Sequence, residues 1–284
     1  MILVTGATGK LGRLVIAALL ETVPPTEVSA LVRNPEVASD LRTLGVDVRQ
    51  GDYNDPASLS AAVQGVDKVL LISSSEIGAR ASQHKNVIDA AKAARVKLLA
   101  YTSILHGGKS PLALAKEHAE TEAYILAADV PYVILRNGWY FENYTENLGA
   151  ALEHGAILGA AQEGRIAAAS RRDFAQAAAA VVTRDGTAGQ VYELAGDVPF
   201  TMNELAAEVS RQFGKEVVYS DMPQDKYSEF LQSVGLPGPV ADIFADSDAH
   251  AARGALNDAS GDLKRLIGRP TTTLSEAVRK AANK

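Results

Sequence analysis

The sequence contains no cysteine among its 284 residues, and this absence removes several kinds of chemistry at once. Disulfide bonds, thiolate nucleophiles and cysteine metal sites are excluded, and a chain without cysteine suits a reducing compartment. No apolar run approaches the roughly 20 residues that a membrane-spanning helix needs. The apolar start of the chain also lacks the charged region of a secretory signal. We therefore expect a cytoplasmic protein that makes no contact with a membrane.

Clusters of basic residues are equally absent, and the net charge of −6 argues against a nucleic-acid partner. Most of the histidines have no carboxylate or histidine neighbour at the spacing of metal ligands, so we predict no metal site. The apolar fraction of 47% and the charged fraction of 22% are those of an ordinary globular enzyme. The histidines without such neighbours are His84, His106, His154 and His250.

Three glycines near the start of the chain form the most informative motif. Gly6, Gly9 and Gly12 follow an apolar run at residues 2–5 and precede a stretch with the apolar spacing of a helix at residues 11–19. A strand, a glycine turn and a helix in this order direct free N–H groups and a positive dipole end at an anion. The GxxGxxG spacing therefore predicts a dinucleotide site, with a turn at Gly6 and close approaches at Gly9 and Gly12.

The residues around this turn indicate which dinucleotide is bound. Arg33 follows the second predicted strand, where sites that prefer NAD carry an acidic residue. Its planar cationic group suits a 2′-phosphate, although a solvated loop arginine is the alternative. Lys10 and Arg13 oppose the dipole of the first helix, and bound phosphates would explain them. We expect NADPH to be preferred over NADH.

The alternation of strands and helices predicts the fold. Apolar runs alternate with helical patterns up to residue 137, which is typical of a doubly wound parallel sheet of the Rossmann type. From residue 138 to 284 the rhythm changes, and we interpret this part as a smaller C-terminal α/β lobe on the substrate side, not strictly separable from residues 1–137. We expect strands at residues 2–5, 27–32, 46–49, 68–72, 97–102 and 132–136, and helices at 11–19, 35–44, 56–63, 79–94, 111–128 and 173–182.

Polar residues stand at the carboxyl ends of two further predicted strands. Asp52 follows the third strand, where it either bonds an adenine ring or serves as a plain turn residue. Ser73, Ser74 and Ser75 follow the fourth strand, and small residues there would line the passage of the cofactor along the sheet edge.

The tyrosine–lysine pair of short-chain dehydrogenases is missing from the helix after the fifth strand. His118 stands in that helix and is a candidate proton donor, with a surface pair to Glu122 as the alternative. A second candidate is the aromatic segment at residues 137–144. There Asn137 could hold the nicotinamide or a substrate carbonyl, and Tyr140 or a water could supply a proton. The aromatic rings form either a slot for a flat substrate or ordinary core packing.

Five segments carry a family resemblance: GATGKLG, LVRNP, LLISSSE, AYTSILH and LRNGWYFENY. Together with GRPTTTLSEAV near the C-terminus, they resemble the NmrA-like branch of the atypical short-chain dehydrogenases, and within it the bacterial NAD(P)H:quinone oxidoreductases. The triphenylmethane-dye reductases share the glycine turn but differ in the aromatic segment. Lys10 departs from the glutamine that is more frequent in relatives.

This resemblance implies a flavin-free, metal-free enzyme that passes hydride from NADPH to a small-molecule quinone. A redox-sensing regulator that binds NADP(H) without turnover and a reductase of cationic aryl dyes are the alternatives. The sequence leaves open whether the chain forms a homodimer. The resemblance places the cofactor on Gly6, Ala7, Thr8, Gly9, Lys10, Leu11, Arg33, Ser73, Ser74, Ser75, Asn137, Gly138, Trp139, Tyr140, Phe141 and Glu142.

Overall fold

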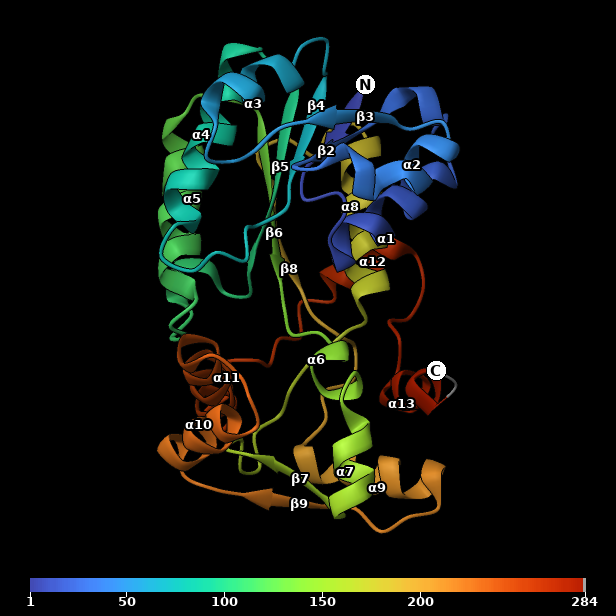
Figure 1. Cartoon of the computed structure of the whole chain (residues 1–284), viewed down its shortest axis with the longest axis vertical. Helices are drawn as coiled ribbons and strands as arrows, with labels where there is room; N and C mark the ends of the chain where they lie inside the picture. The colour runs from blue at the N-terminus through green and yellow to red at the C-terminus, as the bar shows by residue number, and fades with distance from the viewer. Residues whose placement is uncertain (283–284) are drawn as a thin grey trace.

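A seven-stranded sheet in the order β3-β2-β1-β4-β5-β6-β8 forms the centre of the computed structural model, which describes residues 1–282 (Figure 1). Each pair of neighbouring strands is parallel. The doubly wound α/β fold is therefore confirmed. The strands of this sheet are β1 (Ile2–Val4), β2 (Val28–Val32), β3 (Asp47–Gln50), β4 (Lys68–Leu71), β5 (Leu98–Ile104), β6 (Tyr132–Asn137) and β8 (Val191–Leu194).

Helices cover both faces of this sheet, so that most of its strands are buried on both sides (Figure 1). Successive side chains of a strand point to opposite faces. Val4 accordingly packs with α1 and α8, whereas Leu3 packs with α3, α4 and α5. The helices against the sheet are α1 (Lys10–Leu20), α2 (Ser39–Thr43), α3 (Pro56–Ala62), α4 (Arg80–Ala93), α5 (Ala115–Ala127), α8 (Arg171–Thr183) and α12 (Asp262–Ile267).

A smaller lobe lies beyond the carboxyl ends of the strands (Figure 1). It contains a two-stranded parallel sheet of β7 (Ala156–Gly159) and β9 (Val218–Asp221). Its core joins Phe141, Phe200 and Val209. The helices of this lobe and its junction are α6 (Glu142–Thr145), α7 (Leu148–His154), α9 (Met202–Phe213), α10 (Gln224–Ser233), α11 (Gly238–Ala251) and α13 (Leu274–Ala282).

The chain does not divide in space at residue 137. Strand β8 pairs with β6 in the main sheet, and α8 packs against α1 in the sheet core. Strand β8 therefore belongs to the first unit, whereas the predicted boundary places every residue after 137 in the lobe. Residues 138–169 and most of the chain after residue 195 form the lobe, and α12 returns to the sheet.

Two predicted helices differ from their expected bounds. The helix expected at residues 35–44 is divided into a 3₁₀ turn, η2 (Pro35–Ala38), and α2. The helix expected from residue 111 begins only at Ala115. Before it, the backbone N–H of Ala113 donates to Asp246 of α11 at 2.8 Å. That bond attaches residues 111–114 to the lobe.

Two helices of the lobe begin with a capping box. At α9, Thr201 and Glu204 form this box with both reciprocal hydrogen bonds present. The same reciprocal pattern joins Thr273 and Glu276 at the start of α13.

The glycine turn brings α1 unusually close to the end of β1. Gly6 adopts a left-handed backbone conformation with a φ of +57°. A Cβ atom on Gly12 would lie 2.3 Å from the carbonyl oxygen of Gly6 and 2.8 Å from Cα of Ala7. Only glycine at position 12 permits this approach.

We therefore expect Gly12→Ala to lower the free energy of unfolding by about 1–3 kcal/mol, because the added methyl group must displace backbone. Denaturation in urea measures this loss. Gly149→Ala in α7 is the matched control, since a Cβ there meets no atom within 4 Å, and it should stabilise the protein by about 0.5–1 kcal/mol. Equal effects of the two substitutions would contradict the close approach.

Candidate active site

A cavity of about 610 Å³ opens at the carboxyl ends of β1, β2, β3 and β4. The residues predicted from the glycine turn and from the ends of β2, β3 and β4 line it together, except Ala7, whose side chain is fully buried. The predicted residues 137–142 after β6 do not line this cavity. The lining residues include Gly6, Thr8, Gly9, Lys10, Leu11, Gly12, Arg33, Asp52, Tyr53, Ser73, Ser74, Ser75, Glu76 and Gln83.

The glycine turn supplies one wall of this cavity. Helix α1 begins after Gly9 with no side chain bonded to its first turn and no acidic residue there. Its first backbone N–H groups therefore have no partner within the helix, as at every helix start. An uncapped, positively polarised helix end beside Lys10 favours an anionic group in the cavity.

Arg33 and Glu76 face one another across the cavity rim. Arg33 Nη1 lies 3.3 Å from Glu76 Oε1, and both side chains are largely exposed. An exposed pair of this kind is weak. The guanidinium can therefore exchange Glu76 for a stronger anionic partner at little cost, as the predicted role in binding a 2′-phosphate requires.

Asp52 forms a turn, which was one of its two predicted roles. Its Oδ1 accepts from the backbone N–H of Asn54 at 2.8 Å, and its own N–H donates to Ser58 at 3.0 Å. Its side chain still borders the cavity. The neighbouring Tyr53 hydroxyl donates to the carbonyl of Ile72 at 2.9 Å and accepts from the hydroxyl of Thr5, so the phenol is held as part of the cavity wall.

Buried polar residues hold the Ser73–Ser75 segment from behind. The N–H of Ser73 donates to Thr102 at 2.9 Å, and the N–H of Ser74 donates to Nε2 of His84 at 2.9 Å. Arg80 donates from Nε to the carbonyl of Ser74 at 2.7 Å. Because Nε2 of His84 accepts, this ring is neutral. Burial, and secondly the charge of Arg80, lower the pKa of His84 to about 3.

His118 does not lie on the surface, so the alternative interpretation, a surface pair with Glu122, is wrong. It is 6% exposed, and its Nδ1 lies 2.7 Å from the hydroxyl of Tyr101. Glu122 instead bonds Arg136 at 2.6 Å and Ser103 at 2.5 Å. Burial, with the charge of Arg80, lowers the pKa of His118 well below its usual value. A neutral, buried imidazole is a poor proton donor, and its predicted catalytic role stays a prediction.

Asn137 and Tyr140 lie together at the end of β6. Burial raises the pKa of Tyr140, and the neighbouring Asn137 opposes that shift. Oδ1 of Asn137 is buried and has no partner among the described residues. An unpaired buried acceptor destabilises the folded state unless a ligand supplies a donor. This oxygen therefore marks a place where a donor group of a ligand would fit.

The four aromatic rings that follow do not form a single slot. Phe141 is 2% exposed and stacks on Phe200 with centroids 5.6 Å apart, so it belongs to the core of the lobe. Tyr144 meets the edge of the same Phe200 ring. Trp139 packs against Phe244, and Tyr140 against Phe174. The core-packing alternative therefore holds for Phe141, whereas Trp139 and Tyr140 are only half-buried.

A second cavity, of about 940 Å³, adjoins the glycine turn and is bordered by Phe141, Glu142 and Lys10. Glu146 bonds Lys10 at 2.5 Å and Arg171 at 2.5 Å. The Arg171 guanidinium lies 5.2 Å from the centre of the Tyr140 ring. These contacts join the cofactor turn to the aromatic segment of the lobe.

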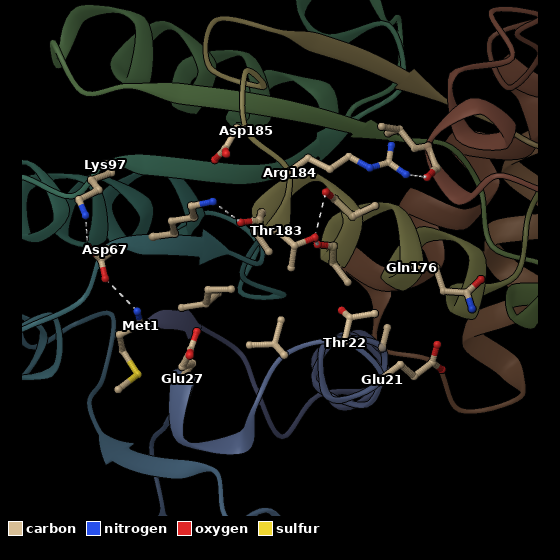
Figure 2. A pocket seen from close by; sticks show the side chains of 18 of the residues that line it. Met1, Glu21, Thr22, Glu27, Asp67, Lys97, Gln176, Thr183, Arg184 and Asp185 are labelled. Atoms are coloured by element: carbon tan, nitrogen blue, oxygen red, sulfur yellow. Dashed lines mark hydrogen bonds and ion pairs between the residues drawn. The ribbon is translucent and has the colours of Figure 1, made fainter.

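A third cavity, of about 820 Å³, lies at the opposite edge of the sheet, where the strands begin. Figure 2 shows Asp67 there between the amino group of Met1 and Lys97, at 2.8 and 2.7 Å. Lys68 donates to the carbonyl of Val182 at 2.8 Å. These groups bond one another or the backbone, and we assign no chemistry to this cavity.

Sequence reasoning missed Glu76, Gln83, His84 and Arg80 as parts of the site. Their spacing in the sequence follows no known motif. The turn between β4 and α4 brings their side chains together in space.

Within residues 1–282, no group of acidic or histidine side chains could hold a metal ion. None of the helices in this part of the chain has the length and apolarity that spanning a bilayer requires.

Comparison with known proteins gives one consistent picture. The model of the NmrA-like family matches residues 1–260. Quinone oxidoreductase 2 of Escherichia coli K12 is 54% identical over 278 residues, which cover 98% of this chain and 97% of that protein. The crystal structure of E. coli NADPH-dependent quinone oxidoreductase QOR2 with NADPH covers all of both chains with a TM-score of 0.98. Triphenylmethane reductase of Citrobacter sp. with NADP(H) is 41% identical, with a TM-score of 0.95, over 99% of this chain and 100% of that one.

The neutral His84 makes the stability of the protein depend on pH. Its pKa is about 3 in the folded state against 6.5 without perturbation. As the pH falls, His84 therefore binds a proton in the unfolded chain before it does so in the folded protein. The free energy of unfolding falls as the pH drops below about 6.5. Between about pH 7 and pH 5, we expect the wild type to lose about 1–2 kcal/mol more than His84→Gln, whose amide oxygen accepts without titrating.

Urea denaturation across this pH range measures the difference. His154→Gln replaces an exposed histidine at the end of α7 and should keep the pH dependence of the wild type. If His84→Gln shows that same dependence, His84 does not titrate as its burial implies.

Proposed function

The chain belongs to the NmrA-like family, and on that premise we propose that it is an NADPH-dependent quinone oxidoreductase that works without a flavin or a metal. The observation that carries this proposal is the cavity at the sheet edge, which joins the glycine turn, Arg33 and the Ser73–Ser75 segment. The near-complete identity of fold with the E. coli QOR2–NADPH complex supports it. The 54% identity to E. coli quinone oxidoreductase 2 supports the choice of a quinone.

The residues of the cavity fit a reduced dinucleotide phosphate. The uncapped start of α1 would bind the pyrophosphate, with Lys10 adding positive charge. Arg33 would exchange Glu76 for the 2′-phosphate. The Ser73–Ser75 backbone, held by Thr102, His84 and Arg80, would form the floor of the passage toward β6.

The reacting end would lie at Asn137 and Tyr140. When bound, NADPH supplies the hydride and becomes NADP⁺, and a quinone that gains this hydride and one proton becomes an aromatic hydroquinone. The unpaired Oδ1 of Asn137 is an acceptor, so it suits the amino group of a carboxamide rather than a substrate carbonyl. Burial raises the pKa of Tyr140, so its hydroxyl stays protonated at neutral pH and can donate to the quinone oxygen.

Positioning carries most of the rate in this proposal. A quinone is electrophilic, and its reduction restores aromaticity, so a tyrosine–lysine pair is not required to drive the proton transfer. Trp139 and Tyr140 are the half-buried rings that would lie against a flat substrate. Neutral His118, bonded to Tyr101, would support the segment behind the serines rather than transfer protons.

We propose a small-molecule substrate. We also propose a cytoplasmic location, because the absence of cysteine suits a reducing compartment. A reductase of triphenylmethane dyes is the second candidate, because the Citrobacter reductase shares the fold at 41% identity.

The purified protein should oxidise NADPH in the presence of a simple benzoquinone, with no flavin added. The decrease in absorbance of the reduced cofactor measures this rate, and competition between the quinone and a triphenylmethane dye separates the two candidate substrates.

Tyr140→Phe should lower kcat by about tenfold or more if the hydroxyl donates the proton. Tight binding of NADPH without turnover of any quinone or dye would identify a sensor instead of an enzyme.

Arg33→Ala should weaken NADPH binding by about 1.5–3 kcal/mol, because one charge-assisted contact with the 2′-phosphate is lost. NADH lacks this phosphate and should bind almost as before. Arg42→Ala removes an exposed arginine from nearby α2 and is the matched control for charge. Equal losses for NADPH and NADH in Arg33→Ala would rule out its contact with the phosphate.

A further inference from the structure

Gln83 is a buried glutamine whose amide is only half satisfied. It lies on α4, is 2% exposed, and borders the cavity beside Asp52 and Glu76. Its Nε2 donates to Glu76 Oε2 at 2.7 Å and to Asn54 Oδ1 at 3.3 Å. Its Oε1 is buried and has no hydrogen-bond partner within residues 1–282.

The neighbours of Gln83 fix which end of the amide faces the cavity. Both Glu76 and Asn54 present oxygen acceptors to Nε2. A rotated amide would place Oε1 against the carboxylate of Glu76, where two acceptors repel each other. Gln83 therefore offers an acceptor and no donor to a ligand.

The position of Gln83 identifies the part of the ligand that it meets. Arg33, the residue proposed for the 2′-phosphate, pairs with the same Glu76 that holds Gln83. Asn54 belongs to the turn after β3, far along the sheet edge from Asn137 on β6. Gln83 thus lies at the adenosine end of the cavity, where a phosphate offers no hydrogen at neutral pH and the donors are the ribose hydroxyl and the exocyclic amino group of adenine. Asp52 borders the cavity as a second acceptor, and two acceptors match the two hydrogens of the amino group rather than the single hydrogen of a hydroxyl.

We propose that Oε1 of Gln83 accepts a hydrogen bond from the exocyclic amino group of the adenine ring, and that Glu76 holds the amide in this orientation. The proposal rests on the proposed function, since it requires NADPH in the cavity. The amino group carries two hydrogens, so Asp52 can accept the second one through Oδ2 while its Oδ1 holds the turn. Gln83 is then a specificity residue for the base, and Glu76 is a positioning residue.

The test compares NADPH with its deamino analogue, in which hypoxanthine replaces adenine and a carbonyl oxygen replaces the amino group. Against this oxygen Gln83 presents a second acceptor, and the buried oxygen stays unpaired. We expect the wild type to bind NADPH about tenfold or more tightly than deamino-NADPH. The fluorescence of the reduced nicotinamide, which both nucleotides share, measures both dissociation constants.

Two variants assign this preference to residues. Gln83→Leu removes the acceptor, so its preference for NADPH should fall to within about threefold. Glu76→Gln lets the amide of Gln83 rotate and should reduce the preference in the same direction. Both nucleotides carry the 2′-phosphate, so the ratio of their affinities is insensitive to changes at Arg33. The ratio of NADPH to NADH affinity should stay unchanged in Gln83→Leu.

Gln64→Leu, at an exposed glutamine after α3, is the matched control and should keep the preference of the wild type. Equal binding of both nucleotides by the wild type overturns the proposal without any variant, so a Gln83→Leu protein that fails to fold does not prevent the test. An unchanged preference in folded Gln83→Leu overturns it as well. Binding of neither nucleotide by the wild type would instead reject the proposed function.

Discussion

The rest of the structure depends on the contact between the turn after β1 and the first turn of α1. With no side chain at Gly12, the helix lies against the Gly6 carbonyl and its start faces the cavity. In this position α1 packs on the alanine-rich α8 within the larger core. Helix α8 begins at Ser170, directly after Ala169, whose backbone pairs with Tyr140. The close approach of Gly12 to the Gly6 carbonyl thus orients the start of α1, where we propose that an anion binds. Through α8 it also orients Tyr140, which lies at the proposed reacting end.

A second constraint comes from the polar residues buried behind Ser73–Ser75. Backbone groups in a loop must find partners when they are buried, and here Thr102, His84 and Arg80 provide them. Because Nε2 of His84 accepts, the loop keeps its shape only while the imidazole is neutral. The charge of Arg80 contributes to this neutrality, since it disfavours a second positive charge nearby. These three buried residues therefore support the proposed cofactor passage rather than the chemical step.

The parts of the site that sequence reasoning recovered are those set by local rules. The glycine turn, Arg33 and Ser73–Ser75 each follow a strand directly, and parallel strands bring their carboxyl ends to one edge. The placement of β8 was not recoverable, because a four-residue strand carries no mark of the sheet that it joins. Glu122 was paired with His118 by helical spacing, yet the half-buried Arg136 on β6 is a stronger partner for its carboxylate. Gln83 and Glu76 meet across a turn, and no periodicity encodes such a contact.

The carboxylate of Glu76 makes two contacts of different strength, one with Arg33 and one with Gln83. Its contact with Arg33 is long, at 3.3 Å, and lies between two largely exposed groups, so it contributes little to stability. Its contact with Gln83 is 2.7 Å and involves a buried amide, so breaking that bond would leave a buried donor with poorer partners. In the proposed complex, an incoming phosphate would therefore compete for Arg33 alone, and the carboxylate would stay on Gln83. The arginine would be released at little cost, whereas the amide proposed to face the base would keep its orientation.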